Sequence, residues 1–202
     1  MERPLQQQQV YRGHFLDVRR DTVSLPDGDT AGREYIVHPG AVMIVPILDD
    51  GRLVLERQCR YPLGRVLLEF PAGKLDPGES RWDCAQRELA EETGYRATEW
   101  ALAAHLHNAP AYSNEFIEIW FARGLQRGER KLDRGEFLDV CEMGEAELDA
   151  LASRGERTDA KTLIALMWLQ KWRSGQWPLA WRATHARPPS ASSAHEGSEP
   201  AL

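Results

Sequence analysis

The sequence lacks long hydrophobic runs and an excess of basic residues. Its longest apolar runs, such as Ala41 to Leu48, are far too short to span a bilayer core of about 30 Å. No basic stretch followed by an apolar run opens the chain, so we expect no secretory signal and a cytoplasmic protein. The net charge of −6 disfavours nucleic-acid binding, which needs basic surface to neutralise phosphates. A small phosphate ligand remains compatible with it, because bound metal ions can reverse the local charge.

Cysteine is also scarce. The three cysteines, Cys59, Cys84 and Cys141, are odd in number and lack metal-ligand spacing, so we expect reduced, partly buried thiols. The chain has 202 residues, of which 42% are hydrophobic and 28% charged. Those values are ordinary for a soluble globular protein, and the length allows one domain with a full core and a small appended subdomain.

The two ends of the chain have little to bury. Residues 1–9 contain a glutamine run, and residues 183–202 are rich in Pro, Ser, Ala and Gly, so both are predicted to be disordered. Residues 10–38 alternate loosely and turn at Pro26–Asp29, which predicts a small antiparallel sheet. Residues 39–182 are predicted to form the main domain, in which the predicted strands outnumber the helices and no regular βαβ order appears. We therefore expect an α+β fold in which helices pack on both sides of a mixed β-sheet.

One predicted helix concentrates acidic residues. It begins after Ser80, a good N-cap residue with Asp83 three positions later, and ends before Gly94. Glu88 and Glu92 are four residues apart and therefore share one helix face. Clustered hard oxygen ligands suit Mg²⁺, whereas the alternative is simply a solvated acidic face.

The wider pattern decides between those alternatives. The segment from Gly73 to Tyr95 matches the Nudix signature at every fixed position, namely Gly73, Glu79, Arg87, Glu88, Glu91, Glu92 and Gly94. Seven fixed positions match by chance on the order of once in 10⁸ starts. The sequence therefore resembles the Nudix hydrolases. One departure is Tyr95, where the signature usually has an aliphatic residue at a packing position.

The resemblance is strongest to the ADP-ribose pyrophosphatases of this family. It extends over roughly Val10 to Trp172, including segments 12–46 and 56–73, and Pro110 stands sixteen residues after Gly94, as in that subfamily. It implies a Nudix fold, a homodimer that exchanges N-terminal strands, and Mg²⁺-dependent hydrolysis of ADP-ribose to AMP and ribose 5-phosphate. Mn²⁺ is a possible substitute for Mg²⁺.

The resemblance also implies roles for particular residues. Glu88, Glu92 and the carbonyl of Ala72 would hold the metal. Glu91 would be a further acidic contributor to catalysis, and Arg87, with Glu79, would support the helix and loop. Arg60 and Glu115 would contact substrate, and Arg33 is a weaker candidate that would reach the neighbouring subunit's substrate. Water activation would fall to an acidic loop residue, Glu136, with Asp133 as the alternative.

Two other functions remain open at this stage. Another nucleoside diphosphate sugar, such as GDP-mannose, would use the same diphosphate site. A non-catalytic Nudix module that senses a nucleotide and controls a partner is the alternative from a different class, although the signature glutamates here are intact.

Overall fold

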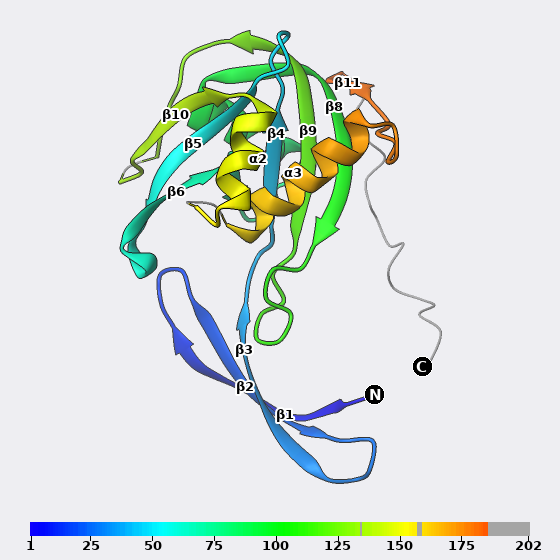
Figure 1. The fold of residues 1–202 in the computed structure, drawn as a ribbon. Coiled ribbons are helices and arrows are strands. Elements are labelled where there is room, and N and C mark those ends of the chain that lie inside the picture. The colour runs from blue at the N-terminus through cyan, green and yellow to red at the C-terminus, as the bar shows by residue number, and fades with distance from the viewer. Residues whose placement is uncertain (134, 157–158, 186–202) are drawn as a thin grey trace.

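The computed structural model describes residues 1–133, 135–156 and 159–185. Three β-sheets, two of them in the main body, carry the fold (Figure 1). The N-terminal sheet has the order β1-β2-β3 and contains β1 (Arg3–Arg12), β2 (Asp17–Ser24) and β3 (Thr30–Val37). It extends away from the main body, to which β3 connects through residues 38–40.

The main body is built on a five-stranded mixed sheet. Its order is β11-β8-β9-β4-β7, from β4 (Ala41–Pro46), β7 (Ala72–Lys74), β8 (Tyr95–Leu106), β9 (Ile117–Arg127) and β11 (Arg182–Ala183). Strands β4 and β9 run parallel, and the other pairs are antiparallel. A second, antiparallel sheet has the order β10-β5-β6, from β5 (Leu53–Arg60), β6 (Arg65–Glu69) and β10 (Leu138–Met143). A short 3₁₀ turn, η1 (Tyr61–Leu63), joins β5 to β6.

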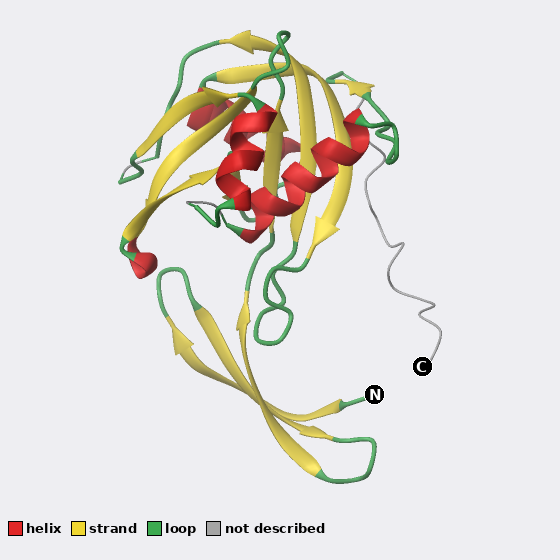
Figure 2. Ribbon diagram, in the orientation of Figure 1, coloured by secondary structure: helices red, strands yellow, loops and turns green. Residues whose placement is uncertain are grey.

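Helices cover both faces of the five-stranded sheet, as predicted. Strand β4 is buried on both sides: Met43 and Val45 join the core beneath α2 (Glu145–Ser153) and α3 (Ala160–Arg173), whereas Val42 and Ile44 pack towards α1 (Arg81–Glu88). Figure 2 shows α2 and α3 lying across the front of the sheet. The structure thus confirms the α+β architecture. Among the described residues, no helix is long and apolar enough to cross a membrane.

The structure departs from the predictions at part of each chain end. Residues 3–12 form β1 and pair with β2 along its length, because a strand can satisfy its backbone by pairing even when its side chains are polar and exposed. At the other end, Ala183 belongs to β11, and the Thr184 amide donates to the Thr98 carbonyl at 2.8 Å. The rest of the predicted tail, residues 186–202, lies outside the described residues.

Strand β8 begins at Tyr95, directly after the left-handed Gly94 that ends the glutamate-bearing helix. Tyr95 and Ala97 are buried while Arg96 and Thr98 are exposed, which is the alternation of a strand with one face on the core.

Candidate functional site

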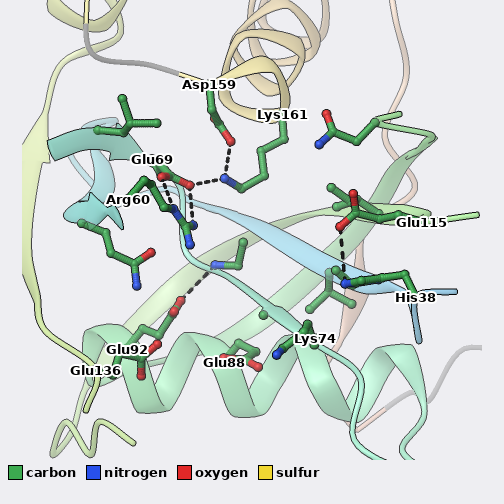
Figure 3. Close-up of a pocket in the computed structure, with 18 of the residues that line it drawn as sticks. His38, Arg60, Glu69, Lys74, Glu88, Glu92, Glu115, Glu136, Asp159 and Lys161 are labelled. Atoms are coloured by element: carbon green, nitrogen blue, oxygen red, sulfur yellow. Dashed lines mark hydrogen bonds and ion pairs between the residues drawn. The ribbon is translucent and has the colours of Figure 1, made fainter. Parts of the chain in front are cut away.

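A cavity of about 900 Å³ opens between the two sheets of the main body. Its walls come from segments far apart in the sequence: β4, the end of β5, β7, the end of α1, the loops around residues 108–115 and 133–136, and the start of α3. Figure 3 shows the charged side chains that converge there. Nearly all of the residues proposed from the sequence as site residues line this cavity, with Arg33 as the exception.

The helix that bears the glutamates begins and ends where the sequence predicted. Ser80 caps it by accepting a hydrogen bond from the Asp83 amide at 3.1 Å, and Gly94 ends it at a φ of 76°. Its last turn, η2 (Leu89–Thr93), is wound as a π-helix, which the sequence pattern did not indicate. Single π-turns of this kind are frequent at functional sites.

Glu88 and Glu92 are buried on the cavity floor, with 9% and 3% of their surfaces exposed. Glu92 accepts a hydrogen bond from the Ala72 amide at 2.9 Å. The Glu88 carboxylate lies over Gly73, where a Cβ atom would come within 1.8 Å of its Oε1. The signature glycine is therefore needed to leave room for this carboxylate.

The electrostatics of these two carboxyls match that burial. Loss of water around the carboxyl raises the pKa of Glu88 to about 7 and the pKa of Glu92 to about 10. The negative charge of Glu136 raises both pKa values further, and Arg87 opposes the rise at Glu88. A cation at this floor would compensate the repulsion between the ionised carboxylates.

Arg87 organises the polar side of the helix. Its Nε and Nη2 atoms donate to the two oxygens of Glu79, both at 2.8 Å, and its Nη1 donates to Glu88 at 2.7 Å and to Glu91 at 3.1 Å. The paired guanidinium holds the pKa of Glu79 down at about 2. Arg87 therefore holds Glu91, four residues later on the helix, and Glu79 supports Arg87 from the loop before the helix.

The chemistry of this floor fits a divalent metal with oxygen ligands. Among the described residues, no three His, Cys, Asp or Glu side chains are gathered so as to hold an ion unaided. Glu88, Glu92 and the backbone of Ala72 nevertheless converge there, and the space above Gly73 is filled by a carboxylate. Mg²⁺ commonly takes one or two protein carboxylates and completes its shell with water and substrate phosphates.

The loop before β10 brings two acidic residues to the cavity. Asp133 and Glu136 both line it and form one turn, in which the Glu136 amide donates to the Asp133 carbonyl at 3.1 Å. Figure 3 shows Glu136 beside Glu92. Between these two residues, Glu136 is the one whose negative charge adds to the raised pKa values of Glu88 and Glu92.

The three predicted substrate contacts have different positions. Arg60 reaches the cavity from the end of β5, and Glu115 faces it from the loop before β9, where its Oε1 lies 3.6 Å from His38 Nε2. Arg33 does not reach the cavity of its own chain. It is exposed on β3 and pairs with Glu2 beside it in the N-terminal sheet.

Sequence reasoning missed several charged or titratable residues at or near this site, among them His38, Glu56, Glu69 and Lys161. Glu56 and Glu69 are each 1% exposed, and Lys161 is 8% exposed. A signal existed for Glu69, because it is an acidic residue inside the apolar run from Val66 to Phe70. Buried charges of this kind are rare unless they are paired.

Comparison with known proteins covers almost the whole described chain. Residues 37–166 match the NUDIX domain family, and residues 2–36 match the nucleoside diphosphate sugar hydrolase N-terminal domain. An ADP-ribose pyrophosphatase of Bacillus subtilis is 35% identical, covering 84% of this chain and 92% of the relative. A methanol dehydrogenase activator of Bacillus methanolicus is similar to the same extent. The crystal structure of an ADP compounds hydrolase, 30% identical, superposes with a TM-score of 0.78 over 87% of this chain and 95% of that one.

Proposed function

The chain belongs to the Nudix hydrolase family, and we propose that it hydrolyses the diphosphate of ADP-ribose, giving AMP and ribose 5-phosphate. The observation that carries this proposal is that two buried carboxylates, Glu88 and Glu92, line the same cavity as the cationic Arg60. That arrangement suits a diphosphate held between an arginine and a metal-binding floor. The similarity to an ADP-ribose pyrophosphatase and to an ADP compounds hydrolase supports ADP-ribose as the substrate.

Glu88, Glu92 and the carbonyl of Ala72 are proposed to hold Mg²⁺, with Mn²⁺ as a substitute. When bound, such a cation would neutralise charge on the diphosphate and lower the pKa of a bound water. Arg87 keeps Glu88 and Glu91 oriented through its hydrogen bonds. Its planar group, already fixed on both oxygens of Glu79, cannot be replaced by lysine without losing this geometry.

Glu136 is proposed to orient the attacking water and accept its proton, with Asp133 as the alternative. A general base must lie within hydrogen-bond reach of the proton that it removes. The position of Glu136 beside Glu92 supports its assignment. Glu115, across the cavity, is proposed to contact the substrate, and its Oε1 lies 3.6 Å from the His38 ring.

The protein is also proposed to act as a homodimer through its N-terminal sheet. This sheet and the turn between β1 and β2 expose several apolar side chains, which is costly for an isolated chain, namely Leu5, Val10, Tyr11, Phe15 and Leu16. A dimer would also give the exposed Arg33 a route to the substrate of the other subunit. Sedimentation equilibrium tests this proposal, which a monomer at micromolar concentration would contradict.

Two alternatives have specific support. The match of residues 2–36 to a nucleoside diphosphate sugar hydrolase domain favours a wider substrate class, which includes GDP-mannose. The similarity to a protein named as a dehydrogenase activator favours control of a partner. A panel of nucleoside diphosphate derivatives with Mg²⁺ separates them. Tenfold higher kcat/KM for another nucleotide sugar would replace ADP-ribose, and no hydrolysis across the panel would favour the regulatory module.

A further inference from the structure

Four charged residues form an ion network on the cavity wall opposite the metal-binding floor (Figure 3). Glu69 Oε1 accepts from Arg60 Nε at 2.7 Å, and Glu69 Oε2 accepts from Arg60 Nη2 at 2.8 Å. The same Oε2 also accepts from Lys161 Nζ, which in addition pairs with Asp159. Glu69 is therefore held between two cations from different parts of the chain.

The side chains of this network differ in how much of their surface is exposed. The Glu69 side chain is 1% exposed and that of Lys161 is 10% exposed, whereas 39% of the Arg60 side chain remains exposed. Lys161 is engaged by two carboxylates and has little surface to offer a ligand. Arg60 keeps its Nη1 atom without a protein partner among the described residues, so this is the nitrogen that can meet a diphosphate oxygen.

The anchorage of Lys161 is rigid. It is the second residue of α3, whose first turn is capped by Asp159 through a 3.0 Å hydrogen bond from the Thr162 amide. Thr162 Oγ1 in turn accepts from the Phe70 amide at 3.4 Å, next to Glu69 in the sequence. The start of α3 and the end of β6 are thus fastened together, and Lys161 acts from a fixed backbone.

A second buried carboxyl, Glu56, adds negative charge beside Glu69. Glu56 is 1% exposed, its Oε2 has no hydrogen-bond partner in the part of the chain that the structure describes, and burial together with the Glu69 charge raises its pKa to about 8. Lys161 counters both effects, since its charge lowers the pKa of Glu56 and of Glu69. Without that charge, Glu69 would be held by Arg60 alone beside another acid, and its hold on the guanidinium would weaken.

We propose that Lys161 is a positioning residue for substrate binding: by fixing Glu69 it holds the Arg60 guanidinium in the orientation that receives the diphosphate. The inference rests on the proposed function only in taking a diphosphate as the ligand. It assigns Lys161 no contact with substrate. Any effect of Lys161 on binding must therefore pass through Arg60. This dependence on Arg60 distinguishes Lys161 from a lysine that binds substrate and from one that only stabilises the fold.

A double-mutant cycle on the full chain tests this route. The variants are Lys161→Met, Arg60→Ala and the double variant, and Lys171→Met is the matched control, because Lys171 lies on the same helix and bonds to Gln176 away from the cavity. The Kd for ADP-ribose is measured without divalent metal, so that no turnover is needed. KM, kcat and Tm are measured alongside with Mg²⁺.

We expect Lys161→Met to weaken binding and raise KM about tenfold, the loss of one charge-assisted contact, while kcat changes much less. In the Arg60→Ala background the same substitution should have no further effect, and Lys171→Met should bind like the wild type. An equal loss in both backgrounds would overturn the proposal, as would wild-type binding by Lys161→Met. If Lys161→Met fails to fold, Lys161→Gln removes the same charge and enters the same cycle.

The cycle also separates this proposal from the identity of the substrate. If the wild type does not bind ADP-ribose, that assignment fails. The cycle is then run with the nucleoside diphosphate that binds tightest in the panel. Arg60-dependent loss on that ligand would still support the positioning role, and Arg60-independent loss would still refute it.

Discussion

Replacing Gly73 with alanine should disturb the metal-binding floor while leaving the stability of the fold nearly unchanged. A Cβ atom at this position would lie 1.8 Å from Glu88 Oε1 and 1.9 Å from its Cδ. The carboxylate would have to retreat by about 1.6 Å to reach the 3.4 Å at which ordinary contact begins. The clashing atoms are the end of a flexible side chain, so the carboxylate rather than the backbone is expected to move.

The size of the effect follows from that displacement. A misplacement of about 1 Å at a reacting centre can cost about 100-fold in rate, so we expect kcat/KM to fall at least about 100-fold. The backbone should tolerate alanine, because Gly73 is not among the glycines with a positive φ and sits in β7 opposite Val42. Replacing glycine with alanine at a compatible position stabilises a protein by about 0.4–1 kcal/mol, because it reduces the conformational entropy of the unfolded chain. The Tm should therefore change by only a few degrees.

The assay compares Mg²⁺-dependent hydrolysis of ADP-ribose with thermal unfolding in the same preparations. Gly144→Ala is the matched control, since Gly144 has a φ of −72° and no atom within 4 Å of an added Cβ. Gly144→Ala should keep wild-type activity. Wild-type activity in Gly73→Ala would refute the idea that this glycine makes room for a catalytic carboxylate. A collapse of Tm alongside activity would show that the backbone, not Glu88, takes up the clash.

Three further predictions concern the acidic residues. Glu92→Gln should reduce kcat by orders of magnitude at saturating Mg²⁺ with the fold intact, as circular dichroism and turnover together would show; retained turnover would remove Glu92 from the metal site. Glu136→Gln should lower kcat about 100-fold or more while Asp133→Asn lowers it far less; the reverse order would transfer the water-activating role to Asp133. The folded pKa of Glu88, about 7, and that of Glu92, about 10, lie above the ordinary value of 4.5, so the folded state binds more protons than the unfolded state as pH rises above 4.5. Without metal, these two groups should therefore lower stability from pH 4.5 upwards, and the rise in Tm on adding Mg²⁺ should be larger at about pH 8 than at about pH 6, because fewer protons compete with the ion. An equal rise at both values would contradict the assignment of Glu88 and Glu92 as ligands.

The sequence predicted local structure best at positions where the backbone requires a particular type of residue. Ser80 and Gly94 mark the ends of the helix because a cap and a left-handed turn need those residue types. The i,i+4 spacing correctly placed Glu88 and Glu92 on one face of the helix, since both line the cavity. The π-turn at Leu89–Thr93 could not be predicted, since this turn lies against β8 and the distant β10, and such packing leaves no mark on residue spacing.

What the sequence missed depends on contacts between distant segments. Lys161 and Glu69 are 92 residues apart, and no local pattern indicates that they pair. The polar strand β1 was predicted to be disordered because its side chains bury nothing, yet its backbone pairs with β2 from Arg3 to Arg12. Arg33 was taken as a weak substrate contact, and its position outside the cavity of its own chain makes any such role depend on a second subunit.

The most direct test of the central claim is kcat/KM of the purified protein for ADP-ribose with Mg²⁺, measured beside GDP-mannose and other nucleoside diphosphate sugars, with the products identified. The account predicts hydrolysis that stops when the metal is chelated, AMP and ribose 5-phosphate as products, and a preference for ADP-ribose. Hydrolysis that persists without divalent metal, or the absence of hydrolysis across the panel, would contradict it.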